Sequence, residues 1–445
     1  MLGMQMNAGR RVFRKGSSGS LFAAIASVCA LGAIFYFIFE LLPYYAIFLS
    51  VNFFFLYVEL VYILKFKEDH EVKTTGKRPF VTVLVPIYNS AKTLEESLRA
   101  IKALKYDGKI EIIAIEDAST DDSYKILRKF RGIRIIRTRR NIGKAASLNL
   151  GIAKARGEMI ATIDSDTFVH PDALTHLASH FTGKEIASVI GLVSVSRPRN
   201  LLQRIQEVEY YVGHGFTQIS YGKLESIFIT PGPLSMYRKS ILFEVGGFDE
   251  DNITEDMDIA LNIRKHSYRI ITTTEARAFT SVPRTLMRLY KQRIRWFRGA
   301  IYNGKKYFSL WFNKAYGTFG RFVFPVSYLI QALSIVVIAR LAQLYLTLLA
   351  GLFYVALAIA PESPAVAFGI ISSFAFRFQS AAIFYITTLL IWGYVVYTSF
   401  SITKRRIGLS DLPPILLFMT VYPMFLSIIY FISFIKEVSS SELKW

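Results

Sequence analysis

The stretch "VTVLVPI", residues 81–87, decides the fold. It is an unbroken apolar run rich in β-branched residues, as expected of a strand that is buried on both faces of a parallel sheet. Comparable runs occur in "KIEIIAIED" (109–117), "IRIIRT" (133–138) and "EMIATIDSD" (158–166), and a segment with helical periodicity separates each run from the next. This alternation predicts an α/β fold with a Rossmann-like, doubly wound and mostly parallel sheet.

Polar clusters follow three of these strands. "PIYN" (86–89), "EDAS" (116–119) and "DSD" (164–166) all stand where a strand is expected to end. In doubly wound sheets, ligands bind beyond the carboxyl ends of the strands. The three clusters are therefore the first candidates for a binding site.

Long apolar segments flank the α/β region. Residues 21–39 and 44–64 form two apolar stretches, each about the ~20 residues that a helix needs to cross a bilayer. The chain is again mostly apolar after residue 320, and its breaks predict three further spans, near 335–359, 381–402 and 412–435. We expect an integral membrane protein with a water-exposed domain between its spans.

The positions of lysine and arginine predict the orientation of this domain. Basic residues precede the first span, follow the second from Lys65 onward, and recur at 404–406. Such loops lie on the inner side of a membrane. We therefore predict a multi-pass protein of the cell membrane, with its large domain cytoplasmic. The expected parts are an N-terminal region with two spans (1–66), the cytoplasmic domain (67–283), interfacial amphipathic helices (284–320), and a C-terminal membrane region (321–445).

The distribution of charge along the chain indicates which kinds of molecule the protein binds. The net charge is +20, but the basic residues lie beside the spans and in one cluster near 288–306. That distribution favours contact with the lipid bilayer and binding of phosphorylated substrates over binding of nucleic acid, which we do not expect. The single cysteine, Cys29, excludes a disulfide framework and a cysteine-based zinc site within one chain.

Two acidic motifs and one lysine are candidates for chemistry. Asp164 and Asp166 stand two residues apart at a strand end, where they repel each other unless a cation such as Mg²⁺ or Mn²⁺ lies beside them. A solvated turn is the other interpretation of this pair. Lys144 lies near an expected helix start, where a cation and free N–H groups can bind phosphate; an ordinary exposed lysine would look the same.

Acids also stand at two other expected helix starts. Glu116 and Asp117 follow the second strand, and "NITEDMDIAL" places Glu255, Asp256 and Asp258 before an apolar periodic run. Helix capping alone can explain acids at such positions. A general base, however, also requires a carboxylate that is held in a sheltered place.

The stretch "LYKQRIRWFRGA" (289–300) places Gln292, Arg295 and Trp296 on one face of an expected helix. An arginine can pair with a diphosphate, and an indole can stack on a sugar. The alternative is a helix whose basic face lies on lipid headgroups. That alternative is our expectation for Arg293 and Arg298, which point away from the other three.

Together these motifs resemble a known family. "VTVLVPIYN", "EDASTD", "GKAASLN", "DSD", "TPGPLSMYRKS", "TEDMDIAL" and "QRIRW" occur in the order and spacing of family 2 processive glycosyltransferases. The chain resembles the hyaluronan, chitin, chitooligosaccharide and cellulose synthase group, closely over residues 75–310. The resemblance implies a GT-A fold for the catalytic domain.

The resemblance also implies roles for individual residues. Pro86, Tyr88 and Asp117 match the uridine pocket, and Lys144 lies near the diphosphate. Asp164 and Asp166 match the motif that binds metal and nucleotide. The remaining matches are Asp256 with neighbouring Glu255 for the catalytic base, Gln292, Arg295 and Trp296 for the motif that closes over the diphosphate and the acceptor sugar, and Gly232 for the acceptor side.

Three residues depart from the family pattern. Ala118 stands where the family usually has glycine, Glu116 where it usually has aspartate, and Leu234 where several relatives have cysteine. The departures leave the chemistry intact but weaken any assignment of the sugar.

The function implied is an inverting, metal-dependent synthase. It would polymerise sugar of the GlcNAc type from a UDP-sugar onto a growing polysaccharide or oligosaccharide and pass the product across the membrane. One rival is a non-processive glycosyltransferase that acts on a lipid carrier. Another is a membrane transporter whose cytoplasmic domain has no catalytic activity. The "QRIRW" motif argues against the first, and the acids at 164, 166 and 256 argue against the second.

Overall fold

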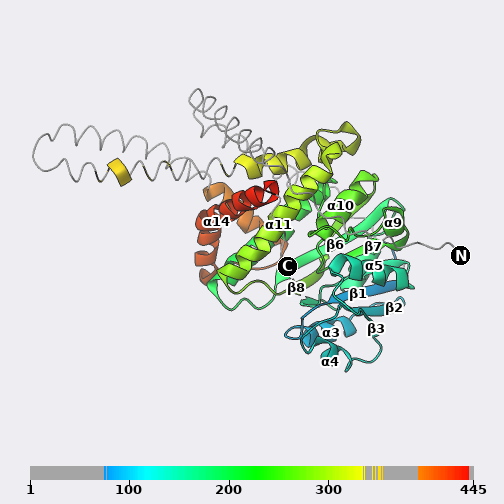
Figure 1. Cartoon of the computed structure of the whole chain (residues 1–445). Coiled ribbons are helices and arrows are strands. Elements are labelled where there is room, and N and C mark those ends of the chain that lie inside the picture. The colour runs from blue at the N-terminus through cyan, green and yellow to red at the C-terminus, as the bar shows by residue number, and fades with distance from the viewer. Residues whose placement is uncertain are drawn as a thin grey trace, which may run out of the picture.

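The computed structural model describes residues 75–76, 78–333 and 389–439, together with single residues between 335 and 353. Its centre is an eight-stranded sheet in the order β3-β2-β1-β4-β7-β6-β8-β5 (Figure 1). The strands are β1 (Val81–Ile87), β2 (Ile110–Glu116), β3 (Arg134–Arg137), β4 (Met159–Thr162), β5 (Thr167–Val169), β6 (Ile186–Val195), β7 (Ser235–Arg238) and β8 (Arg269–Thr280).

The strands that the sequence predicted form the parallel half of this sheet. β1 pairs in parallel with both β2 and β4, and β2 pairs in parallel with β3. The other half is mixed, because β7 runs antiparallel between β4 and β6, and β5 runs antiparallel to β8. The prediction of an α/β sheet is confirmed, but the sheet is mixed rather than mostly parallel.

Helices cover both faces of the sheet, as a doubly wound fold requires. On one face, Val81, Val83 and Val85 of β1 pack with α3 (Leu94–Lys102) and α6 (Ala173–Ser179). On the other face, Leu84 packs with the helices α5 (Lys144–Lys154), α9 (Lys239–Glu244) and α10 (Glu255–Lys265). Since both faces of β1 are buried, its unbroken apolar run needs no alternation.

A helical part adjoins the sheet. It contains α7 (Leu201–Tyr210), the π-helix η1 (Tyr211–Thr217), α8 (Gln218–Lys223), α11 (Leu286–Lys306) and α14 (Leu412–Val438). Side chains of α7, η1, α11 and α14 share one apolar cluster that includes Phe216, Leu289, Phe400 and Tyr422. In Figure 1, α11 and α14 lie side by side. Short helices of the described chain are α4 (Ser123–Leu127), η2 (Phe308–Leu310), η3 (Lys314–Tyr316), η4 (Phe319–Val323) and η5 (Leu409–Asp411). Two apolar helices, Phe319–Leu333 and Leu389–Ile402, are also present, and the second covers the described part of the span expected at 381–402.

One helix in the described part of the chain has the length and composition of a membrane span. Residues Leu409–Val438 form 30 residues of helix with a mean hydropathy of 2.2 in the most apolar window. This helix contains the span expected at 412–435. The spans expected at 21–39, 44–64 and 335–359, and the first part of 381–402, lie outside the described residues.

Candidate active site

Three loops meet at one edge of the sheet. Because β2, β1 and β4 are parallel neighbours, the residues that follow them emerge at the same edge. The hydroxyls of Ser90 and Ser165 lie 2.7 Å apart, and the Asn89 N–H donates to the Ser119 hydroxyl at 3.1 Å. Tyr88, half-exposed, follows partly buried Pro86 in the first of these loops. The structure thus brings together the three polar clusters that the sequence singled out.

Asp117 fixes the loop that leads to α5. Its carboxylate accepts hydrogen bonds from the Thr138 hydroxyl and from the N–H groups of Ile142 and Gly143, each at 2.9 Å. These bonds set the position of the first helical residue, Lys144. Beyond the nucleotide contact expected of it, Asp117 therefore holds the loop in place.

Ala118 adopts a left-handed backbone conformation. Its φ is +53°, and this conformation costs an L-residue other than glycine roughly 1–2 kcal/mol. The family that this chain resembles usually has glycine at this position. Glycine would relieve the backbone strain there.

We expect Ala118→Gly to raise the free energy of unfolding by about 1 kcal/mol, because the relief of strain exceeds the added entropy of the unfolded chain. Denaturant titration of the purified protein measures the change. The control is Ala100→Gly, inside α3, which should lower stability by about the same amount. Equal destabilisation by both substitutions would contradict the prediction.

Lys144 joins two acids from different elements. Its Nζ lies 2.7 Å from Oδ1 of Asp164 and 3.0 Å from Oε1 of Glu255. Burial works to lower the pKa of Lys144, but Asp164 and Glu255 outweigh it and raise the pKa. Burial likewise opposes ionisation of Glu255, yet Lys144 lowers the pKa of that carboxyl overall. These shifts favour the charged forms of Lys144 and Glu255, and the two ion pairs of Lys144 tie the sheet edge to the start of α10.

Gly232 lies against this ion triad. A Cβ atom placed on Gly232 would stand 2.5 Å from the Lys144 Nζ and 2.9 Å from the Asp164 Oδ2. Any side chain would therefore displace the pair. The residue expected on the acceptor side touches the charged groups of the site, and only glycine leaves them in place.

Asp166 lacks a full counter-charge. Burial, followed by the repulsion of Asp164, raises the pKa of Asp166 to about 6, and Lys144 offsets this only in part. Its Oδ1 accepts weakly from the Thr280 hydroxyl, at 3.4 Å. Within the described residues, no group of three or more His, Cys, Asp or Glu side chains could hold a metal. An ion at Asp164 and Asp166 would therefore complete its shell with phosphate oxygens and water, as Mg²⁺ commonly does.

Asp256 is the second residue of α10 and remains partly exposed. Its Oδ1 accepts from the N–H of Met257 at 2.8 Å. Burial and the neighbouring Glu255 raise its pKa to about 6, against the opposing charges of Lys144 and Arg295. A carboxyl with this pKa is still mostly ionised at neutral pH. Since Glu255 is buried in an ion pair, Asp256 is the acid of this pair that can reach a substrate.

The helix α11 carries the three residues of the "QRIRW" motif. The charge of Arg295 opposes the effect of burial on the pKa of Glu255 and Asp256, at the start of α10. Trp296 stacks beneath the guanidinium of Arg293, whose carbon lies 4.1 Å from the ring centre. Gln292 accepts a hydrogen bond from Arg293 at 3.3 Å. Arg293 thus supports two of the three motif residues.

The expectation that Arg293 and Arg298 face the membrane surface is wrong. Their exposed fractions are 1% and 6%. Arg293 pairs with Glu209 of α7 and donates to the Tyr422 hydroxyl of α14 at 3.3 Å. Arg298 pairs with Glu437 of α14 at 2.9 Å. Their helix face is covered by α7 and α14, which are distant in sequence, so helical spacing alone could not reveal the partners.

We expect Arg293→Met to lower the melting temperature by roughly 5–10 °C, because it leaves the Glu209 carboxylate without its buried partner. Thermal unfolding of the detergent-solubilised protein measures the shift. Lys291→Met, at an exposed position two residues earlier, is the control and should change it little. If both variants melted like the unaltered protein, the ion pair would contribute nothing to stability.

Comparison with known proteins identifies the family of one part of the chain that carries this site. The model of glycosyl transferase family 2 matches residues 82–246, which run from β1 to the end of α9. Residues 82–246 are a glycosyl transferase family 2 domain. The family 2 domain contains Pro86, Tyr88, Asp117, Lys144, Asp164, Asp166 and Gly232. Glu255, Asp256 and the three α11 residues lie beyond the matched span.

Relatives of the family 2 domain include named synthases. A poly-beta-1,6-N-acetyl-D-glucosamine synthase of Staphylococcus aureus (strain COL) is 31% identical over 271 residues, which cover 59% of this chain and 65% of the relative. A synthase of the same name from Staphylococcus epidermidis is 30% identical over 274 residues, with the same coverage. The match thus spans slightly less than two thirds of these relatives.

A solved structure shares the fold. A mannosyltransferase from Pyrobaculum calidifontis, solved with GDP-Man and Mn²⁺, has a TM-score of 0.53 and 21% sequence identity over 81% of this chain and 98% of that chain. The similarity supports the Rossmann-like GT-A architecture predicted for the sheet domain.

Proposed function

We propose that this protein is an inverting, metal-dependent polysaccharide synthase that adds sugar of the GlcNAc type from a UDP-sugar donor to a growing chain. The observation that carries the proposal is the partly exposed carboxylate of Asp256, which has a pKa of about 6, at the same edge as Lys144 and Asp164. The names of the staphylococcal relatives support a GlcNAc polymer.

Donor binding would use the loops at the sheet edge. In this proposal Tyr88 and Pro86 contact the uracil, and Asp117 holds the loop that borders it. Lys144 and Arg295 bind the diphosphate, for which Lys144 exchanges a carboxylate partner for phosphate oxygens. Asp164 and Asp166 hold a Mg²⁺ or Mn²⁺ ion, which when bound offsets the negative charge of the diphosphate.

Transfer would follow from the position of Asp256. Its carboxylate accepts the proton of the acceptor hydroxyl while that oxygen bonds to the anomeric carbon of the donor. The bond from this carbon to the diphosphate oxygen breaks at the same time, and UDP leaves with its electron pair. Because the attack comes from the side opposite UDP, the anomeric configuration inverts. Glu255 keeps Lys144 in place and does not receive the proton.

In this proposal Gln292, Trp296 and the segment around Gly232 bind the acceptor sugar. An indole ring gives a sugar a flat surface on which to stack. Since Arg293 already covers one face of the Trp296 ring, the other face is the one offered to the acceptor.

The proposal includes passage of the product through the membrane region, with the family 2 domain on the cytoplasmic side of the cell membrane. Two observations support that arrangement. The helix Leu409–Val438 is long and apolar enough to cross a bilayer. Arg405, in the basic loop at 404–406, pairs with Glu207 of α7, so this loop and the family 2 domain lie on the same side. The division into parts at residues 66, 283 and 320 belongs to the same proposal.

A panel of radiolabelled UDP-sugars tests the function. Purified full-length protein is incubated with each donor and Mg²⁺ or Mn²⁺, and the product is separated by size. A polymer from UDP-GlcNAc is the expected result. A labelled glycolipid of a single sugar would instead identify a non-processive enzyme that acts on a lipid carrier, and no product from any donor would refute the proposal.

A further inference from the structure

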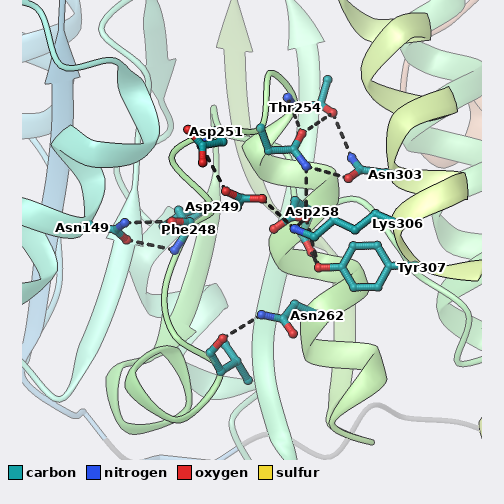
Figure 2. Close-up of polar contacts among 12 residues, drawn as sticks. Asn149, Phe248, Asp249, Asp251, Thr254, Asp258, Asn262, Asn303, Lys306 and Tyr307 are labelled. Carbon is teal, nitrogen blue, oxygen red and sulfur yellow. Dashed lines mark hydrogen bonds and ion pairs between the residues drawn. The ribbon is translucent and has the colours of Figure 1, made fainter. Parts of the chain in front are cut away.

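A second face of α11 packs against the start of α10. We call this contact the α10–α11 seam and define it by Thr254, Asp258, Gly299, Asn303 and Lys306. Figure 2 labels all of these residues except Gly299. At Gly299 the two elements touch so closely that a Cβ atom there would overlap the Thr254 side chain. The approach therefore requires glycine at this position of α11.

The middle of the seam is a buried hydrogen-bond network. The Asn303 side chain, fully buried, donates to the Thr254 hydroxyl at 3.0 Å and accepts from the Asn252 side chain at 2.7 Å. The Asn252 side-chain oxygen accepts from the Thr254 N–H at 3.0 Å. Thr254 is the residue that precedes Glu255 and Asp256, so these bonds hold the backbone at the start of α10.

The far end of the seam is an ion pair. Asp258, 1% exposed, accepts from the Lys306 Nζ at 2.5 Å and from the Tyr307 hydroxyl at 3.0 Å (Figure 2). Lys306 also pairs with Asp249 at 2.7 Å, in the loop before α10. Two carboxylates from two segments thus meet one lysine of α11.

The two helices joined in this way carry different parts of the proposed site. α10 begins with Glu255 and Asp256, whereas α11 carries Arg295 and Trp296 one turn before Gly299. Directional hydrogen bonds fix the separation of two helices more narrowly than apolar packing does, because they weaken steeply with distance and angle. Four of the five seam residues are polar, and none of them belongs to the ion triad of Lys144.

We propose that the α10–α11 seam sets the position of the Asp256 carboxylate relative to Arg295 and Trp296, and that Asp258, Asn303 and Lys306 are positioning residues for sugar transfer. The inference rests on the proposed function, since it assigns the seam to that same site. A misplacement of about 1 Å can cost about 10²-fold in rate, so loosening the seam should act on turnover rather than on donor binding.

The test compares Lys306→Met with Lys305→Met in full-length protein reconstituted into lipid nanodiscs. Lys305 is the adjacent lysine and is not one of the seam residues, so its substitution removes the same charge from the same helix while the ion pairs of Lys306 with Asp249 and Asp258 remain. Three quantities are measured: the rate of sugar transfer, the dissociation constant for UDP, and amide hydrogen exchange at residues 254–258. Asp258→Asn and the double variant with Lys306→Met complete the set.

For Lys306→Met we expect kcat to fall by about tenfold or more, with UDP affinity changed by less than about twofold. Exchange at residues 254–258 should become faster. The double variant should lose no more activity than the more impaired single variant, because the pair acts as a unit. If Asp258→Asn does not fold, Lys306→Met alone decides the matter.

Three results would overturn the seam proposal. The first is an unchanged kcat in Lys306→Met, and the second is an equal loss of kcat in Lys305→Met. The third is a slower sugar transfer in Lys306→Met that weaker UDP binding explains completely. Failure of the proposed function would look different, since the unaltered protein would then form no product from any UDP-sugar. Hydrogen exchange reports on the seam even in that case. Unchanged exchange at residues 254–258 in Lys306→Met would refute the claim that the seam holds the start of α10 in place.

Discussion

Asp256→Asn should lower the rate of sugar transfer by about 10²-fold or more, the usual contribution of a general base. Asparagine keeps the size of the side chain and can still accept the hydrogen bond of the Met257 N–H, but it cannot take up the proton of the acceptor hydroxyl. Donor binding should stay near normal, because Lys144, Asp164 and Asp166 are unchanged.

Calorimetric UDP binding and a polymer assay on the same preparations measure both effects. Glu255→Gln is the matched control and should cost much less activity, since Glu255 is engaged with Lys144 rather than with solvent. The unaltered protein should also lose activity as the pH falls below about 6, where the raised pKa of Asp256 leaves its carboxyl protonated. Substantial polymer from Asp256→Asn would assign the base to another residue.

The second large effect concerns Asp166. Asp166→Ala should abolish transfer and greatly weaken binding of UDP in the presence of Mg²⁺ or Mn²⁺. Without the second carboxylate the ion has too few protein ligands, and the diphosphate then meets the uncompensated charge of Asp164. A chelator should have the same effect on the unaltered protein.

Asp107→Ala is a suitable control, because this carboxylate is 89% exposed and precedes β2, at the edge of the sheet opposite the site. Activity and metal-dependent UDP affinity should both match those of the unaltered protein in this variant. Full activity with a chelator present would remove the metal from the proposed mechanism, and full activity of Asp166→Ala would remove this residue from the metal site.

Local sequence patterns predicted half of the sheet well. β1 to β4 are short apolar runs separated by helices, and this alternation is the pattern of a doubly wound sheet, in which such strands pair in parallel. The antiparallel insertion of β7 was not predictable in this way. Its four residues, Ser235–Arg238, run antiparallel between β4 and β6, and the alternation of strands and helices along the chain does not indicate such an insertion.

The candidate site also has a part that the sequence predicted and a part that it did not. Tyr88, Asp117, Asp164 and Asp166 follow predicted strands, so their common location could be foreseen. The sequence did not reveal that Glu255 reaches Lys144, because that contact joins residues more than a hundred positions apart. The reversed interpretation of Arg293 and Arg298 has the same origin. From sequence alone, a basic residue near an apolar segment is expected at the surface. That expectation changes only when an acidic partner from a distant part of the chain is known.

The polar contacts that α7 and α11 make with α14 and the loop before it have a practical consequence for protein production. A shortened chain that stopped before Leu389 would keep the whole sheet but lose Tyr422, Arg405 and Glu437. Arg293 would lose its hydroxyl partner, and Glu207 its arginine, while the apolar cluster around Phe216 and Leu289 would become open to water. Such a fragment should aggregate when expressed, so biochemical work on this protein calls for the C-terminal helix and a detergent or lipid environment from the start.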